Sequence, residues 1–145
     1  MNVGTKETVY TIGHSTRTIK EFIDILKHYG IEQVVDVRAI PRSRTNPQFN
    51  REELEQVLPG AGISYFYAKD LGGLRKPRKD SPNTGWRNDS FRGYADYMQT
   101  PEFSNAIQHL MELAKHKTTV IMCAEVLPWR CHRKLIADAM VVRGF

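Results

Sequence analysis

The sequence predicts an α/β fold, a three-layer α/β/α sandwich around a mainly parallel, Rossmann-like sheet. Short runs of β-branched and apolar residues alternate with segments whose apolar residues recur at helical spacing. The runs at 33–38 and 118–124 are apolar almost throughout, as in strands that helices cover on both faces. With 145 residues, 41% of them hydrophobic, the chain has the size and composition of one domain, residues 1–145, around a single core.

Four strands are predicted, each bounded by turn residues. They cover residues 8–13, 33–38, 63–68 and 118–124. Pro41 and Pro47 exclude a regular element directly after the second strand. Residues 69–88, rich in glycine, proline and charge, form the longest irregular stretch, and a loop of that length in a small domain is usually functional or disordered.

Five helices are predicted from capping and breaking signals. Thr18 and Glu21 form a capping box before the first helix, and Gly30 ends it. Asn50 with Glu53 caps the second helix. The helices are expected at residues 19–30, at 50–60 with the Pro-Gly pair as the end, at 91–99, from 100 up to the fourth strand, and at 131–144.

Polar side chains follow each of the four predicted strands. Because ligands of open α/β sheets bind outside the carboxyl ends of the strands, these side chains predict a site at that rim. The candidate catalytic residues are His14, Asp36 and Glu125. The candidate ligand-binding residues are Ser15, Arg38, Ser43, Arg44, Gly72, Gly73, Arg130, His132 and Arg133.

Several of these residues also have purely structural interpretations. His14 alternatively hydrogen-bonds a neighbouring turn. Asp36 and Arg38 point to the same face of their strand, so they alternatively form a pair that only orders the following loop. On the third helix, Tyr94 and Tyr97 either belong to a packing stripe or stack on a base.

The segment CAEVLPWRCHR, residues 123–133, allows three kinds of site. Thiol phosphatases and sulfurtransferases place a cysteine after a strand and an arginine at the next helix, and Cys123 has that position. Arg130, however, follows one residue later than in the phosphatase pattern, and Glu125 and Pro128 put a negative charge and a missing amide into the loop. Thiol chemistry is therefore disfavoured.

The second kind of site is a metal centre with ligands from Cys123, Cys131, His132 and His14. This spacing matches no strong zinc pattern, and the adjacent arginines disfavour a cation. The sequence therefore predicts no metal ligand and requires no cofactor.

The third kind of site binds an anion at the first turn of the last helix, where free amides, Arg130 and Arg133 act as donors. Cys123 is then a small buried residue. We favour this interpretation. It requires Arg133 or Arg130 to face the same cleft as His14 and Arg38, and it requires the first and fourth strands to lie near the centre of the sheet.

The net charge of +5 is concentrated in residues 38–51 and 69–92, which suits a phosphate-bearing small molecule or nucleic acid as partner. No apolar stretch approaches the roughly 20 residues that span a bilayer, and the first residues lack the apolar region of a signal peptide. Two cysteines are expected as thiols. We expect a cytoplasmic protein without a membrane partner, and the oligomeric state stays open.

Taken in order, the blocks TIGHS, VDVRAIPRSR, LGG, CAE and CHR resemble the bacterial and archaeal family called domain of unknown function 488. The resemblance implies an α/β sheet protein whose motif residues gather at one rim, and it names no reaction. It also implies a further strand after the last helix, which this chain is expected to lack. The motif residues are Gly13, His14, Ser15, Asp36, Arg38, Pro41, Ser43, Arg44, Leu71, Gly72, Gly73, Cys123, Glu125, Cys131, His132 and Arg133.

These observations predict an enzyme of the hydrolase or transferase type that acts on a phosphate-bearing substrate, a nucleotide or nucleic acid. His14 is the expected general acid or base, oriented by Glu125 or Asp36. The expected phosphate ligands are Arg38, Arg44 and Arg133. The alternative is a non-catalytic module that binds nucleic acid or a phosphorylated ligand through its basic loops.

Overall fold

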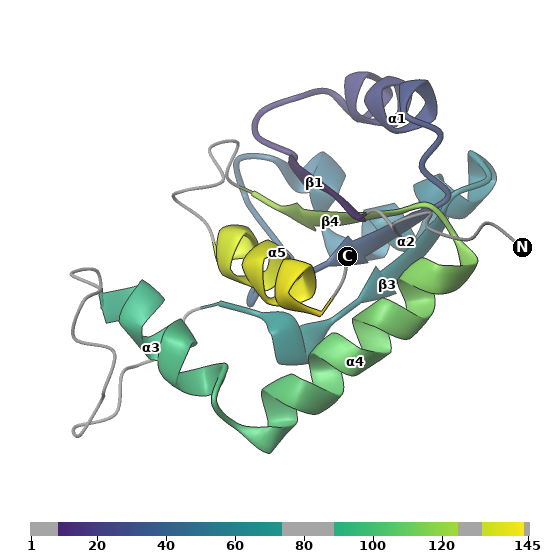
Figure 1. The fold of residues 1–145 in the computed structure, drawn as a ribbon. Coiled ribbons are helices and arrows are strands. Elements are labelled where there is room, and N and C mark those ends of the chain that lie inside the picture. Colours follow the sequence, from purple (N-terminus) through teal and green to yellow (C-terminus); the bar gives the residue numbers. More distant parts are fainter. Residues whose placement is uncertain (1–8, 74–88, 125–131, 144–145) are drawn as a thin grey trace, which may run out of the picture.

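A computed structural model describes residues 9–73, 89–124 and 132–143 of the chain (Figure 1). Within these residues, four strands form one sheet in the order β1-β4-β2-β3, and every neighbouring pair is parallel. The strands are β1 (Val9–Gly13), β2 (Gln33–Asp36), β3 (Ser64–Tyr67) and β4 (Thr119–Cys123). The prediction of a mixed α/β fold with a parallel sheet is confirmed.

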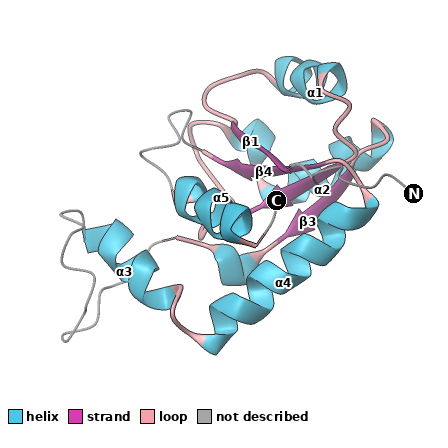
Figure 2. Ribbon diagram, in the orientation of Figure 1, coloured by secondary structure: helices cyan, strands magenta, loops and turns pink. Residues whose placement is uncertain are grey.

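Helices alternate with the strands and cover both faces of the sheet (Figure 2). The α-helices are α1 (Ile19–His28), α2 (Arg51–Gly60), α3 (Asp89–Tyr97), α4 (Pro101–His116) and α5 (Arg133–Val142), and two 3-10 helices are η1 (Pro47–Phe49) and η2 (Lys69–Leu71). Apolar residues of α1 and α2 pack on one face, and those of α3, α4 and α5 pack on the other.

The alternation of side chains along the central strands separates two cores. Val34, Val120 and Met122 face α1 and α2, whereas Val35 and Ile121 face α4 and α5. All five of these side chains are buried, as a strand covered on both faces requires. The sheet is therefore the middle of three layers, and each layer of helices has its own core.

The predicted signals at the helix ends are confirmed at α1 and α4. The Thr18 hydroxyl accepts from the Glu21 amide, and the Glu21 carboxylate accepts from the Thr18 amide at 2.8 Å, so the capping box is complete. The Thr100 hydroxyl caps α4 by accepting from the Phe103 amide. Gly30, just beyond α1, has a φ of 66°, a conformation that favours glycine.

Several boundaries differ from the predictions: α1 ends at His28 instead of residue 30, α3 covers Asp89–Tyr97 instead of 91–99, and α5 covers Arg133–Val142 instead of 131–144. Asn50 stands at the N-cap of α2 but does not cap it, because its side-chain oxygen accepts from the Ser43 amide instead. The predicted end of α2 at the Pro-Gly pair is confirmed, since Pro59 lies in the last turn and the helix ends at Gly60. Residues 69–71, expected to be irregular, form η2. Among the described residues, no helix is both long and apolar enough to cross a bilayer.

Candidate functional site

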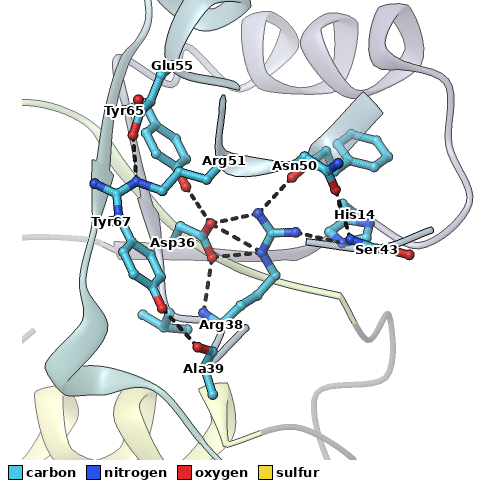
Figure 3. A network of polar contacts seen from close by, with 12 residues as sticks. His14, Asp36, Arg38, Ala39, Ser43, Asn50, Arg51, Glu55, Tyr65 and Tyr67 are labelled. Atoms are coloured by element: carbon cyan, nitrogen blue, oxygen red, sulfur yellow. Dashed lines mark hydrogen bonds and ion pairs between the residues drawn. The ribbon is translucent and has the colours of Figure 1, made fainter. Parts of the chain in front are cut away.

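The carboxylate of Asp36 anchors a buried polar network at the end of β2 (Figure 3). It accepts from the backbone amide of Arg38 at 3.0 Å and from the guanidinium Nε and Nη2 atoms at 2.9 and 2.7 Å. The hydroxyl of Tyr65, on the adjacent strand β3, donates to it at 2.5 Å. Asp36 is 0% exposed and Arg38 6%, so this is the buried ion pair that the two-residue spacing allowed.

This network places the Arg38 guanidinium firmly. Its Nη2 atom also donates to the carbonyl of Phe49 at 2.7 Å, so one edge of the guanidinium is fully occupied. Nη1 points the other way, toward Nε2 of His14 at 3.5 Å. The Asp36 carboxylate accepts from the Arg38 amide, the Arg38 guanidinium and the Tyr65 hydroxyl, and this geometry favours a positioning role for Asp36 over the predicted catalytic one.

His14 follows β1 and is only 2% exposed. Its ring stacks on Phe49, with the ring centroids 4.4 Å apart. Nδ1 lies 2.8 Å from the Ser15 carbonyl oxygen. Since a carbonyl only accepts, Nδ1 carries the proton and Nε2 presents its lone pair toward Arg38.

The surroundings of His14 keep the imidazole neutral. Burial is the main cause that lowers its pKa below the ordinary value, and the positive charges of Arg38 and Arg17 lower it further. The hydrogen bond to Ser15 and the charge of Asp36 act in the opposite direction but do not reverse the shift. At neutral pH the site therefore holds a neutral imidazole beside a guanidinium.

The lowered pKa of His14 predicts how stability depends on pH. In the unfolded chain the imidazole has a pKa of about 6.5. Just below that pH, the unfolded state therefore binds more protons than the folded state. We expect the free energy of unfolding, measured with urea, to fall as the pH falls through this range. His14→Asn should reduce that slope at unchanged buffer and salt; equal slopes in the two proteins would contradict the assignment.

Ser15 holds the carbonyl that orients His14. Its backbone has a φ of 52°, in the left-handed region that non-glycine residues rarely occupy. The Ser15 amide donates to the Ala124 carbonyl at 3.0 Å, and the His14 amide donates to the Cys123 carbonyl at 2.9 Å. The end of β4 thus holds this conformation, and strained residues of this kind cluster at functional sites.

The prediction that the first strand lies near the sheet centre is wrong, because β1 is at an edge of the described sheet. β4 is central, as predicted. His14 and Arg38 nevertheless meet, since β1 and β2 flank β4 and their carboxyl ends lie on either side of it.

The connections after these three strands lead to different faces of the sheet. The helices that follow β1 and β2 pack on the α1/α2 face, whereas α5, which follows β4, packs on the other. Ligands of α/β sheets bind where such connections diverge.

A second cluster lies on the other face, around His132. Its Nε2 lies 2.7 Å from the carbonyl oxygen of Val37, and its ring centroid is 5.0 Å from that of Tyr94. A Cβ atom on Gly73 would lie 3.0 Å from Nδ1 of His132, so any side chain there would require the imidazole to shift by a few tenths of an ångström. The predicted ligand-binding residues Gly73 and His132 are brought together, in a packing arrangement that joins the segment after η2 to the start of α5.

Gly72 is equally confined. A Cβ atom there would lie 3.0 Å from the Lys69 carbonyl oxygen and 3.1 Å from the Cα of Ala39, both backbone atoms. Gly72 thereby packs the chain after β3 against the chain after β2.

We expect Gly72→Ala to destabilise the protein by about 1–3 kcal/mol, because neither backbone neighbour can move without displacing a loop. Gly60→Ala is the matched control, since a Cβ atom at Gly60 meets nothing within 4 Å and alanine favours the helix. Urea midpoints of the two variants measure the difference. Equal midpoints would show that the loops after β2 and β3 accommodate the added methyl group without a loss of stability.

The remaining candidates do not gather at one point. Ser43 donates its amide to Asn50 and accepts the amides of Thr45 and Asn46, so it shapes the loop after β2. Arg44, in the same loop, is exposed. Arg133 is 1% exposed and begins α5, which packs on the face opposite to the one that holds His14. A cleft shared by Arg133 and His14 is therefore not supported.

Some predictions on the last loop fall outside the described residues. Glu125, Arg130 and Cys131 lie there, so the thiol-phosphatase reading, the anion loop and a Cys131-containing metal set stay untested. Where the chain is described, no group of three or more His, Cys, Asp or Glu side chains is arranged to hold a metal ion. Cys123 is buried at the end of β4, the position expected of a structural residue.

The proposed base stacking by Tyr94 is wrong, because this side chain is 1% exposed and its hydroxyl donates to the Leu71 carbonyl at 2.9 Å. The Tyr97 hydroxyl likewise donates to the Asp70 carbonyl. Conversely, the hydrogen bond of Tyr65 to Asp36 was not predicted from the sequence. The alternation along β3 carried that signal, since Tyr65 pairs in register with Val34 and lies beside Asp36 on the same face.

A family model described as domain of unknown function DUF488 matches residues 18–140. The chain belongs to the DUF488 family. No curated protein and no solved structure matches it. The matched range contains Asp36, Arg38, Gly72, Gly73 and His132, and it begins just after His14. In this DUF488 protein, Arg38 contacts His14 on one face of the sheet, and Gly73 and His132 lie together on the other.

Proposed function

We propose that this DUF488 protein is an enzyme that transfers or hydrolyses a phosphoryl group, with His14 and Arg38 as its reacting-site residues. The observation that carries the proposal is the contact of His14 Nε2 with Arg38 Nη1 at 3.5 Å, at the carboxyl rim of the parallel sheet. A neutral imidazole there can take a proton, and a guanidinium donor beside it can hold an anionic oxygen.

The cost of this arrangement supports a functional role. Burying a guanidinium and a carboxylate is expensive, and an apolar pair of similar volume often stabilises a protein as well or better. Here Asp36, Tyr65 and the Phe49 carbonyl fix the guanidinium in one orientation and leave Nη1 directed at His14. Such preorganised charge is what stabilises a developing negative charge in a transition state.

The roles follow from the geometry. Nε2 of His14 accepts the proton of an attacking water or hydroxyl group as the new oxygen–phosphorus bond forms; the bond from phosphorus to the leaving oxygen breaks, and that oxygen departs as an anion that solvent protonates. Nη1 of Arg38 donates to a phosphoryl oxygen, while Asp36 and Tyr65 act as positioning residues. Since His14 is 2% exposed, only a small group such as a water molecule or one phosphoryl oxygen reaches Nε2 without movement of its surroundings.

The test is a turnover screen with nucleoside mono-, di- and triphosphates and short DNA and RNA oligonucleotides, each with and without Mg²⁺. We expect phosphate release or strand cleavage by the wild-type protein that His14→Ala abolishes. A screen without turnover, or an activity that His14→Ala leaves unchanged, would overturn the proposal.

A non-catalytic role is the second candidate, favoured by the exposed Arg44 in the loop after β2, which makes no ion pair with the part of the chain that the structure describes. A module of this kind should bind oligonucleotides with an affinity that falls steeply with salt, since phosphate contacts release counterions. Arg44→Ala should then reduce the salt slope by about one. Binding of this type without turnover would favour the module over the enzyme.

A further inference from the structure

A cavity of about 320 Å³ lies between α1 and the β1 edge of the sheet, away from the His14–Arg38 contact. Most of its wall is apolar, and residues of α1, β1, β4 and the segments next to α1 form it. The apolar lining residues are Ile12, Ile25, Leu26, Ile31 and Val120. This volume is at the lower end of the range for small-molecule pockets, so the space suits a compact ligand.

Two tyrosines line the same cavity. The rings of Tyr10 on β1 and Tyr29 after α1 are 6.0 Å apart at 43°. Both are among the exposed large hydrophobic residues, 38% and 57% exposed. Aromatic rings that are neither buried nor packed on both faces offer contact area to a flat or branched apolar group.

Thr11 and one charged residue, Arg17, complete the lining. Its backbone is fixed, because its amide donates to the His14 carbonyl at 3.3 Å and its carbonyl accepts from Gln48 Nε2 at 2.8 Å. Its Nε atom is buried and has no hydrogen-bond partner among the described residues. The nearby Glu21 carboxylate accepts from the Thr18 amide in capping α1, and the charge of Arg17 contributes to lowering the pKa of Glu21 after the larger effect of that hydrogen bond. As the positively charged residue of the lining, Arg17 would complement an anionic group on a ligand in the cavity.

We propose that this cavity binds a small monocarboxylate, with its apolar body between α1 and β1 and its carboxylate on the Arg17 guanidinium. The apolar wall disfavours a hydrophilic anion such as free phosphate. The single guanidinium favours a ligand that carries one acidic group over an uncharged ligand. The carboxylate is also the anion that a guanidinium binds with two parallel hydrogen bonds. No residue lining the cavity contacts the substrate in the proposed enzyme activity, where Arg17 acts only through the effect of its charge on the pKa of His14.

The test compares acids with their neutral amides by NMR titration of the ¹⁵N-labelled full chain. The probes are benzoate with benzamide, and 3-methylbutanoate with 3-methylbutanamide. We expect the acids to shift the amide resonances of residues lining the cavity, and to bind at least about tenfold more tightly than the amides, the effect of one charged hydrogen bond. Equal affinities of acid and amide, or no shifts at these resonances at millimolar concentrations, would overturn the proposal without any variant.

Variants then separate the two parts of the ligand. Arg17→Met should remove the preference for the acid, and Lys27→Met, which removes an exposed charge on α1 outside the cavity, should not. Ile25→Phe adds volume to the wall and should weaken acid and amide alike. A folded Arg17→Met protein that keeps the acid preference would refute the role of Arg17.

Discussion

Asp36→Ala is expected to destabilise the protein by about 3–5 kcal/mol, because it leaves the Arg38 guanidinium buried without its counter-charge. The Asp36 carboxylate also receives the Arg38 amide and the Tyr65 hydroxyl, so the substitution leaves two further buried donors without an acceptor. Urea denaturation followed by circular dichroism at neutral pH measures the effect.

Two controls distinguish a lost counter-charge from a lost volume. Tyr65→Phe removes one hydrogen bond to a charged group and should cost about 1.5–3 kcal/mol, less than Asp36→Ala. The double variant Asp36→Ala/Arg38→Met removes both charges and should be more stable than Asp36→Ala alone. If the double variant lost as much stability as the single variants Asp36→Ala and Arg38→Met together, the loss of the ion pair would not explain the effect.

The alternation of strands and helices, and the parallel sheet, were predictable because they depend on local patterns. The apolar runs at β2 and β4 are continuous, since both strands face helices on each side. The capping box at Thr18 and Glu21 is a contact within four residues, which the sequence displays directly. The spacing of Asp36 and Arg38 likewise allowed the ion pair, because side chains two apart on a strand share a face.

The strand order was not predictable from the same patterns. The insertion of β4 between β1 and β2 places β1 at an edge, and no local signal in the sequence distinguishes this order from one with β1 at the centre. This strand order, together with the face toward which the chain turns after each strand, places the candidate site residues on two different faces of the sheet. His132, predicted as a ligand-binding residue, contacts Val37, Gly73 and Tyr94, which are far from it in sequence, so its packing role became visible only in the folded chain.

The capping prediction at Asn50 failed for a related reason. Asparagine at this position suits an N-cap, but a tertiary partner, the Ser43 amide, takes its side-chain oxygen at 2.8 Å. The same contact holds the loop after β2 against the start of α2, next to the Phe49 carbonyl that receives Arg38. A local rule was thus overridden at a residue that supports the candidate site.

His14→Ala is expected to lower kcat by about 10²–10⁴-fold for any substrate found in the turnover screen, with a smaller change in KM. The reason is that the variant removes the proton acceptor Nε2, whereas Arg38 keeps its contacts to Asp36 and Phe49 and still holds the phosphoryl group. His109→Ala is the matched control. That imidazole lies on α4, edge-on to Phe66 on the opposite face of the sheet, and its loss should leave kcat unchanged.

The pH profile tests the same assignment without a variant. A general base must be deprotonated, and burial together with Arg38 lowers the pKa of His14. The rate should therefore persist as the pH falls past the ordinary imidazole value of about 6.5 and decline only below it. A decline that begins well above that value would require a base other than His14. A rise in rate toward lower pH would instead make the imidazolium the active form, acting as a general acid, and would reverse the proton transfer that we assign to Nε2.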